Sequence, residues 1–395
     1  MTLMKEKKLQ RIHEIIKAMM FHERMTLAEI VNKVNLSLPK VTEIVNELKK
    51  SGIVNELSSE DFQSMGRPSQ KFQLNSGYGY FIGIDLGRVY TNIVVLDYKQ
   101  NKIYENHLEA FLNLETKIIV KNLNVIINQI LKEVKIEKEK LFGIGVSLPG
   151  IVDGKKGISH TYLKIDGVTL KDYLEEIFKV KVRIEHDVKS MTLGELYYGK
   201  ARGLDNGLYL NFGWGLGLGI IINKELYYGK DSYSGEFGHV PALADGDLCY
   251  CGKTGCLETV ASGRAITKKV REKISAGASS IILNTIVDPD KIGPRDILKA
   301  ANKGDQFSIE ILEEAGKYLG IGIAMLINIF NPEKIIIGGT FTQVASYILD
   351  VAKSNAMKHS LTQLNNNVNF EISNLSNNSG ALGVARLTAI ENCLN

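Results

Sequence analysis

Cysteine and long apolar runs are scarce in this sequence of 395 residues, and each scarcity excludes a class of protein. With only four cysteines, three of them within eight residues, a disulfide-stapled scaffold is excluded and metal binding is favoured. The longest apolar run, IGIAMLINIF before Asn331, is shorter than the ~20 residues that cross a membrane, and the N-terminus is charged rather than signal-like. We therefore expect a cytoplasmic protein without a membrane partner.

The sequence also lacks a strong excess of either charge, since its net charge is only +4. This excess is concentrated in residues 1–75, which hold 12 Lys/Arg and 9 Asp/Glu and so carry 12 − 9 = +3 of it. A content of 44% hydrophobic and 23% charged residues is typical of globular proteins, and the length indicates two or three domains.

Apolar residues at steps of three and four predict three helices in the first 52 residues. The first covers residues 8–20, and the second follows Thr26, which together with Glu29 forms a capping-box pattern. Ser37 is placed to cap the third helix, which tolerates Pro39 in its first turn and ends at Gly52. Two helices joined by a tight turn form a helix-turn-helix, so we assign residues 1–75 to a DNA-binding domain.

The third helix has the pattern of a recognition helix, with an apolar face turned inward and a polar face turned outward. Residues 53–57 and 71–74 then predict two strands of a wing, whose tip carries Arg67 between Gly66 and Pro68. An arginine on such a tip suits a narrow A·T-rich minor groove. The alternative is a winged helix used only for protein contacts. The residues we expect at DNA are Ser37, Lys40, Thr42, Glu43, Asn46 and Arg67.

From Gly79 onward the pattern changes to strands, turns and helices. Three strands open this region, and a buried strand at LFGIGVSLPG and the strand VKVRIEHDV follow later. The strand-loop-strand opening recurs in GLYLNFGWGLGLGIIINKEL. Such duplication predicts two similar α/β lobes that together cover residues 76–395, with site residues on strand ends and loops.

Several motifs spread over the whole chain resemble the ROK family (repressors, open reading frames and kinases), in particular its sugar-responsive, xylose-repressor-like branch. They are GRPSQKFQLN, IGIDLG, GVSLPGIVDG, EHDVKSMTLGE, SGEFGH, CYCGKTGCLE, KIIIGG and GALGVARL. The resemblance implies an α/β fold in which an N-terminal winged helix-turn-helix precedes a two-lobed body of the actin/hexokinase (ribonuclease H-like) type. Family kinases resemble this body without the DNA-binding head.

One histidine and three cysteines form the clearest site pattern in the sequence. The spacing His239-x9-Cys249-x-Cys251-x4-Cys256 supplies the Cys3His set that binds Zn²⁺ tetrahedrally. With four protein ligands there is no open position, so we predict a structural ion. The alternative is a group of buried, unligated cysteines.

The resemblance implies that four residues hold the hydroxyls of a sugar, namely Asp187, Glu236, His239 and Glu258. Carboxylates on loops suit paired hydroxyls, although a single carboxylate can also be an ordinary surface acid. His239 would bind zinc through one ring nitrogen and a sugar hydroxyl through the other. In family kinases the counterpart of Asp187 is the general base, which makes Asp187 a vestigial base here. The preceding residue is Asn in typical family kinases and His186 in this chain, a change that affects the expected effector preference.

The two phosphate-binding loops depart from the pattern of the family kinases. Asp-x-Gly-Gly-Thr is replaced by residues 85–89, DLGRV, and Gly-Thr-Gly is replaced by Gly213-Trp214-Gly215, which contains the only tryptophan. Backbone N–H groups approach phosphate closely only where side chains are small, so both changes count against kinase activity.

We therefore expect a non-enzymatic, sugar-responsive repressor that binds a palindromic operator as a homodimer or tetramer. A monosaccharide, with xylose or glucose preferred, would modulate or release DNA binding, and the short connection Ser76–Tyr80 would transmit the change. Two alternatives stay open at this point. One is an ATP-dependent sugar kinase with a regulatory head, and the other is a zinc-stabilised assembly protein.

Overall fold

The computed structural model describes residues 2–57, 70–365 and 367–394, and its contacts divide the chain into two compact units. The first unit contains Met1–Ser190 and Gly380–Asn395, and the second contains Met191–Ser379. We call residues up to 75 the head, the rest of the first unit the first lobe, and the second unit the second lobe. No helix in the described ranges is both long and apolar enough to cross a membrane.

The head is a winged helix-turn-helix, as the sequence predicts. The capping box forms as expected, because the Thr26 side chain accepts from the Glu29 N–H while the Glu29 carboxylate accepts from the Thr26 N–H. Gly52 adopts the left-handed conformation (φ +75°) that ends the third helix. The elements are α1 (Thr2–Met20), β1 (Met25–Thr26), α2 (Leu27–Val34), α3 (Leu38–Lys50), β2 (Val54–Glu56) and β3 (Lys71–Leu74).

Two details of the head differ from the sequence predictions. Ser37 occupies the N-cap position of α3, but its side chain makes no capping hydrogen bond. Pro39 stands where one of the two usual donors would be and has no N–H. The wing sheet also has a third strand, β1, which pairs antiparallel with β3 in the order β1-β3-β2. Arg67, the predicted wing-tip residue, lies outside the described residues.

The first lobe is a five-stranded sheet with helices on both faces. Its strand order is β10-β7-β4-β5-β6, in which β4, β5 and β6 form an antiparallel meander and β7 and β10 add in parallel. The elements are β4 (Tyr80–Leu86), β5 (Tyr90–Asp97), β6 (Lys102–Glu109), α4 (Thr116–Glu133), β7 (Leu141–Leu148), β8 (Val152–Asp153), β9 (Ile158–Ser159), α5 (Leu170–Phe178), β10 (Lys181–His186) and α12 (Ser379–Glu391).

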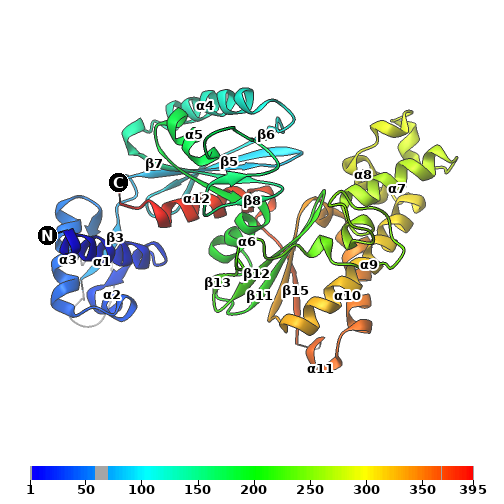
Figure 1. The fold of residues 1–395 in the computed structure, drawn as a ribbon. Coiled ribbons are helices and arrows are strands. Elements are labelled where there is room, and N and C mark those ends of the chain that lie inside the picture. Colours follow the sequence, from blue (N-terminus) through cyan, green and yellow to red (C-terminus); the bar gives the residue numbers. More distant parts are fainter. Residues whose placement is uncertain (1, 58–69, 366, 395) are drawn as a thin grey trace. The chain divides into compact units, whose positions relative to one another are not determined.

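Glycines decide how α12 packs on this sheet. Helices α4 and α5 cover one face, and α12 lies along the other (Figure 1). A Cβ at Gly83 of β4 would lie 1.9 Å from the Ala381 carbonyl oxygen, and one at Gly145 of β7 would lie 2.5 Å from that of Val384. Only glycine therefore allows the helix backbone to approach the sheet this closely.

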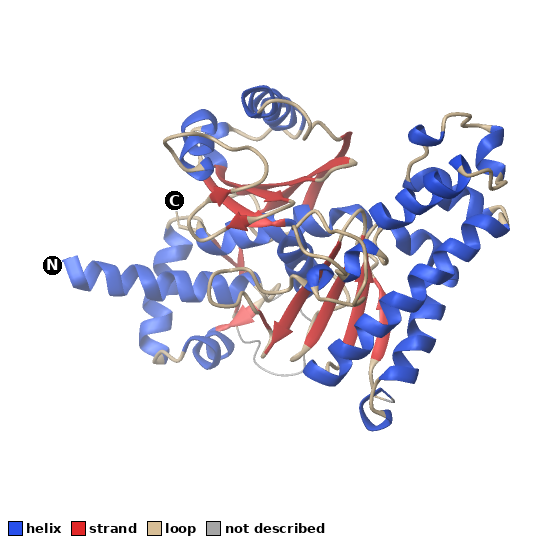
Figure 2. Cartoon of the chain, turned by 45° about the vertical axis from the view of Figure 1, so that its right-hand side comes forward, coloured by secondary structure: helices blue, strands red, loops and turns tan. Residues whose placement is uncertain are grey.

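The second lobe repeats the topology of the first. Its order β13-β12-β11-β14-β15 again places an antiparallel hairpin beside two parallel strands, which confirms the predicted duplication, and long helices cover one face (Figure 2). The chain enters this lobe within α6 (Asp187–Tyr198) and leaves it at the start of α12. The other elements are β11 (Gly207–Phe212), β12 (Leu216–Ile222), β13 (Glu225–Leu226), α7 (Gly263–Ser275), α8 (Pro294–Asn302), α9 (Gln306–Phe330), β14 (Lys334–Gly338), α10 (Ala345–His359), α11 (Thr362–Asn365) and β15 (Asn369–Ile372).

The head and the first lobe share one hydrophobic core. Ile15 and Ile16 of α1 and Ile44 of α3 belong to the same buried cluster as Phe81 of β4 and Ala389 of α12. A head tethered only by a flexible linker would have a separate core. The head is therefore packed directly on the first lobe.

Candidate functional site

The predicted metal ligands come together in the second lobe. Ligand atoms of His239, Cys249, Cys251 and Cys256 all lie within 4.8 Å of one another. His239 ends a short 3-10 helix (Phe237–His239), and the cysteines lie on the loop that leads to a second one (Leu257–Thr259). Gly252 and Gly255 take positive φ values of +84° and +74°, so the loop turns tightly enough to return three thiols to one point.

The distances within this cluster fit a tetrahedral zinc site. The Sγ atoms of Cys251 and Cys256 are 3.7 Å apart, and the Sγ of Cys249 is 3.6 Å from Nδ1 of His239. Zn–S bonds of ~2.3 Å and Zn–N bonds of ~2.0–2.1 Å at tetrahedral angles require separations of about 3.8 Å and 3.6 Å. A disulfide needs about 2.05 Å, and all three cysteines are free. Burial and hydrogen bonds with the neighbouring thiols raise the pKa of Cys256 to about 12. Ionisation of this thiol is therefore unfavourable, and a bound cation would offset that by stabilising the thiolate.

The imidazole of His239 offers its two nitrogens to different partners. Nδ1 faces Cys249, while Nε2 faces the Tyr250 hydroxyl at 3.4 Å and lies 3.9 Å from a Glu236 carboxylate oxygen. The Glu236 side chain is 52% exposed, whereas that of His239 is 24% exposed. A metal on Nδ1 would leave the ring proton on Nε2, directed toward Glu236 and Tyr250.

Glu258 is a buried carboxylate of the second lobe. It is 5% exposed, and its Oε2 accepts the backbone N–H of Leu216 at 3.1 Å. Gly215 and Gly238 adjoin this carboxylate so closely that a Cβ at either would lie 3.1 Å and 3.0 Å, respectively, from Oε2. Glu258 is therefore packed between the Gly213–Gly215 loop and the SGEFGH segment. It is not a solvated surface acid.

Asp187 belongs to the first lobe, where it begins α6 at the end of β10. One of its carboxylate oxygens accepts the Val188 N–H at 2.7 Å and lies 3.2 Å from Nε2 of His186. The structure thus brings Glu236, His239 and Glu258 together in the second lobe and pairs Asp187 with His186 in the first.

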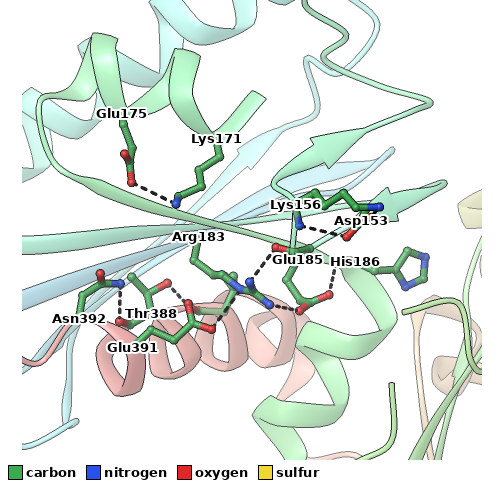
Figure 3. A network of polar contacts seen from close by, with 12 residues as sticks. Asp153, Lys156, Lys171, Glu175, Arg183, Glu185, His186, Thr388, Glu391 and Asn392 are labelled. Atoms are coloured by element: carbon green, nitrogen blue, oxygen red, sulfur yellow. Dashed lines mark hydrogen bonds and ion pairs between the residues drawn. The ribbon is translucent and has the colours of Figure 1, made fainter. Parts of the chain in front are cut away.

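A polar network fixes the strand end that carries Asp187, and Figure 3 shows its members. The Glu185 carboxylate is 1% exposed and accepts both the His186 backbone N–H (2.8 Å) and the Arg183 guanidinium (2.9 Å). Arg183 also donates to the Gly154 carbonyl and lies 3.6 Å from Glu391 at the end of α12. Sequence reasoning missed this network because nothing local relates residue 183 to residue 391.

The two altered phosphate loops contact other segments of the chain. The carbonyls of Gly213 and Trp214 accept the first two N–H groups of α7, from Gly263 (3.0 Å) and Arg264 (2.9 Å). These N–H groups are therefore committed to the loop instead of pointing toward a ligand. In the first lobe, Arg88 stacks over the Tyr162 ring with its Cζ 5.7 Å from the centroid.

Apart from Arg67, which lies outside the described residues, the predicted DNA-facing residues lie on or just before α3. Ser37, Glu43 and Asn46 are exposed, and Lys40 and Thr42 are partly exposed. Lys40 forms an ion pair with Glu43 at 2.8 Å, and the Thr42 hydroxyl donates to the Leu38 carbonyl at 2.8 Å. Lys40 and Thr42 would therefore have to give up these local contacts in order to contact DNA.

The chain resembles known proteins in both sequence and structure. The family model "ROK family" matches residues 81–390, and the model "Winged helix-turn-helix DNA-binding" matches residues 6–55. The DNA-binding transcriptional dual regulator NagC of Escherichia coli strain K12 is 31% identical over 82% of this chain and 79% of its own length. A putative xylose repressor from Caldicellulosiruptor sp. strain Rt8B.4 is 29% identical over 93% of this chain and 92% of its own.

Two solved structures resemble the chain to different extents. A ROK family transcriptional regulator described as a homologue of the E. coli MLC protein aligns with a TM-score of 0.79 and 25% identity, covering 96% of each chain. A ROK family glucokinase from Streptomyces griseus, solved with glucose and AMPPNP, aligns with a TM-score of 0.66 and 27% identity. It covers 78% of this chain and 99% of its own.

Proposed function

The chain belongs to the ROK family, and on this premise we propose that it is a sugar-responsive transcriptional repressor. The observation that carries the proposal is a winged helix-turn-helix head whose hydrophobic core continues into a ROK body. A DNA-reading element that shares a core with a ligand-binding lobe is suited to change its DNA affinity when the ligand binds. Of the two sequence relatives described above, one is a putative repressor and the other a transcriptional regulator by name.

In this proposal the effector is a monosaccharide held by Asp187, Glu236, His239 and Glu258. Each of the three carboxylates can accept hydrogen bonds from two sugar hydroxyls, and Nε2–H of His239 donates to a sugar oxygen. The names of the relatives mention xylose and N-acetylglucosamine, so the class of sugar is supported more strongly than any one member. Xylose and glucose stay our preferred first candidates.

The same proposal assigns His239, Cys249, Cys251 and Cys256 to a structural Zn²⁺ ion. Four protein ligands would complete a tetrahedral shell, so zinc would supply folding energy and fix the imidazole. The role of this chain's residues is positional. Ligation of Nδ1 would hold the ring of His239 so that Nε2–H points toward Glu236 and Tyr250.

DNA binding is assigned to Ser37, Lys40, Thr42, Glu43 and Asn46 on the recognition helix and to Arg67 on the wing. A homodimer, or a tetramer built from it, would place two heads on a palindromic operator, with half-sites one or more helical turns (~34–36 Å each) apart. Phosphate contacts would supply most of the affinity, and groups such as Asn46 would supply base selection.

The coupling between effector and DNA is proposed to run through the first lobe. From Asp187, the path passes His186, Glu185 and Arg183 to Glu391 on α12 (Figure 3). Two residues beyond Glu391, Cys393 contacts His13 on α1 of the head. A sugar that binds one arrangement of this path more tightly would shift DNA affinity by that difference in binding free energy and no more.

A second candidate function is an ATP-dependent sugar kinase with a regulatory head. The similarity to the glucokinase and the retained Asp187, the base position of family kinases, favour it. The substituted loops and the N–H groups that α7 gives to Gly213 and Trp214 favour the non-enzymatic assignment. A coupled assay of ATP consumption with the monosaccharide panel separates the two, because a kinase would turn over at ~1–10³ s⁻¹.

The test of the proposed function is a gel shift with DNA upstream of neighbouring sugar-utilisation genes. We expect retention of that DNA at moderate salt and release by one member of a panel of xylose, glucose and N-acetylglucosamine. A protein that retains no such DNA overturns the repressor assignment. A protein that retains DNA whatever sugar is added overturns the effector assignment.

A further inference from the structure

Tyr250 stands between two of the metal ligands, Cys249 and Cys251, and the family-derived set of sugar ligands does not include it. Its side chain is 59% exposed, yet its hydroxyl lies 3.4 Å from Nε2 of His239. The two rings meet edge to face, with centroids 5.3 Å apart and an interplanar angle of 73°. Although exposed, the Tyr250 side chain is thus oriented with its hydroxyl toward Nε2 of His239.

The ring of Tyr250 is held from two directions. Its backbone is anchored because both neighbouring cysteines belong to the metal cluster. Arg264, the second residue of α7, stacks on the ring with its Cζ 4.6 Å from the centroid. The Arg264 N–H is in turn bonded to the carbonyl of Trp214, so this support is tied to the loop beside Glu258.

The polar groups around Nε2 of His239 come from two different segments. They are the Tyr250 hydroxyl from the cysteine loop and the Glu236 carboxylate, at 3.9 Å, from the SGEFGH segment that also carries His239. With Nδ1 directed to the metal, Nε2 carries the one proton that this ring can donate. A sugar oxygen that accepts this proton is brought next to a phenol that can both donate and accept.

We propose that Tyr250 is a specificity-determining residue of the effector site, with its hydroxyl recognising the substituent adjacent to the sugar hydroxyl that His239 binds. Adjacent ring substituents of a monosaccharide lie about one hydrogen-bond length apart. This spacing is similar to that between the Tyr250 hydroxyl and Nε2 of His239, so the two groups can bind neighbouring substituents. At C2 this substituent is a hydroxyl in xylose and glucose and an acetamido group in N-acetylglucosamine, and the phenol discriminates between these two groups. This inference rests on the proposed function, because it takes His239 as a sugar ligand.

The test compares Tyr250→Phe with the wild-type protein by calorimetric titration of xylose, glucose and N-acetylglucosamine. Tyr227→Phe is the matched control, since Tyr227 is a 48% exposed tyrosine of the same lobe outside the metal cluster. Zinc content is measured on every sample, so that loss of the metal is separated from loss of the hydroxyl. Arg264→Gln is a second variant that leaves the phenol in place and removes its support.

We expect Tyr250→Phe to keep its zinc and to bind the preferred sugar about 5–10-fold more weakly, the effect of one lost hydrogen bond. The ratio of dissociation constants between two sugars should change as well, which a merely structural role would not cause. Arg264→Gln should weaken binding less, and Tyr227→Phe should not change it. Wild-type affinities for all three sugars in zinc-loaded Tyr250→Phe overturn the inference alone, whereas a wild-type protein that binds none of them overturns the proposed effector site and the inference together.

Discussion

The Sγ atom of Cys393, near the end of the chain, lies 3.4 Å from Nδ1 of His13 in the first helix of the head. Cys393 is fully buried, and its carbonyl accepts the Tyr98 hydroxyl at 2.6 Å. The segment after α12 therefore contacts the first lobe and the head at once. Because α12 also begins where the chain returns from the second lobe, one helix links that crossing point to the DNA-binding element.

Arg386 tests this link between α12 and the head. It is 3% exposed, donates to the Met20 carbonyl at 2.7 Å and stacks over Phe21 with its Cζ 4.8 Å from the ring centroid. We expect Arg386→Met to destabilise the packing of the head by about 2 kcal/mol and to weaken operator binding, because it leaves a buried carbonyl without this donor. Denaturant unfolding and a gel shift measure the two effects.

The control for Arg386 is Arg202→Met, since Arg202 is exposed in the second lobe. Sugar affinity should be unchanged in both variants. If Arg386→Met unfolds and binds DNA as the control does, α12 does not hold the head.

Asp85 predicts a pH dependence of stability. Burial, opposed by a hydrogen bond from Ser147 (2.7 Å) and reinforced by the charge of Asp187, raises its pKa to about 7. An unfolded aspartate has a pKa near ~3.9, so between the two values the folded state holds a proton that the unfolded state has lost. The contribution of Asp85 to the free energy of unfolding is therefore fully present below pH ~4, falls as the pH rises to about 7 and is constant above that. The total change is at most about 4 kcal/mol.

Asp85→Asn checks this sign because it imitates the protonated acid and still accepts from Ser147. We expect the variant to gain stability relative to the wild type as the pH rises from 5 to 8, as measured by urea midpoints across that range. A constant difference between the two proteins over this range would contradict the assignment of the proton to Asp85.

Features that depend on residues close together in the sequence could be predicted, whereas features that depend on distant residues could not. The cysteine cluster could be predicted because its three thiols lie within eight residues and His239 is ten positions away. The capping box of Thr26 and Glu29 could be predicted for the same reason. By contrast, β1 is two residues long and is a strand only because Met25 pairs with Phe72, a contact that no local pattern encodes.

Long-range polar contacts account for most of what was missed at the candidate site. Glu258 was expected near the sugar by resemblance, but its bond to Leu216, 42 residues away, emerges only from the fold. The contact of Arg386 with Met20 joins residues 366 positions apart. A local signal did exist for Tyr250, because a residue between two cysteines of the predicted cluster must lie beside that cluster.

The zinc assignment is tested by removing one ligand. Cys256→Ser takes one thiolate from the cluster, so we expect loss of the metal in elemental analysis and a Tm lower by roughly 5–10 °C, because metal binding contributes to folding free energy. Cys393→Ser is the matched control, as Cys393 is equally buried but lies outside the cluster. Stoichiometric metal in Cys256→Ser, or none in the wild type, would contradict the site.

The recognition helix is tested with two asparagines of the head. Asn46 is exposed on α3 and Asn32 is exposed on α2. We expect Asn46→Ala to weaken operator binding roughly 10-fold, the usual effect of losing one base contact, and Asn32→Ala to have little effect. Equal affinities of the two variants, measured by fluorescence anisotropy at one salt concentration, would remove Asn46 from the DNA interface.

Sugar control of DNA binding is measured by the operator affinity of the wild type and of Glu258→Gln, each titrated with xylose, glucose and N-acetylglucosamine. Glutamine can still accept the Leu216 N–H, so the variant should fold and bind DNA like the wild type. We expect one sugar to lower the DNA affinity of the wild type at least 10-fold and to leave that of Glu258→Gln unchanged. A wild-type DNA affinity that none of the three sugars alters, or a variant that responds as the wild type does, would contradict this expectation.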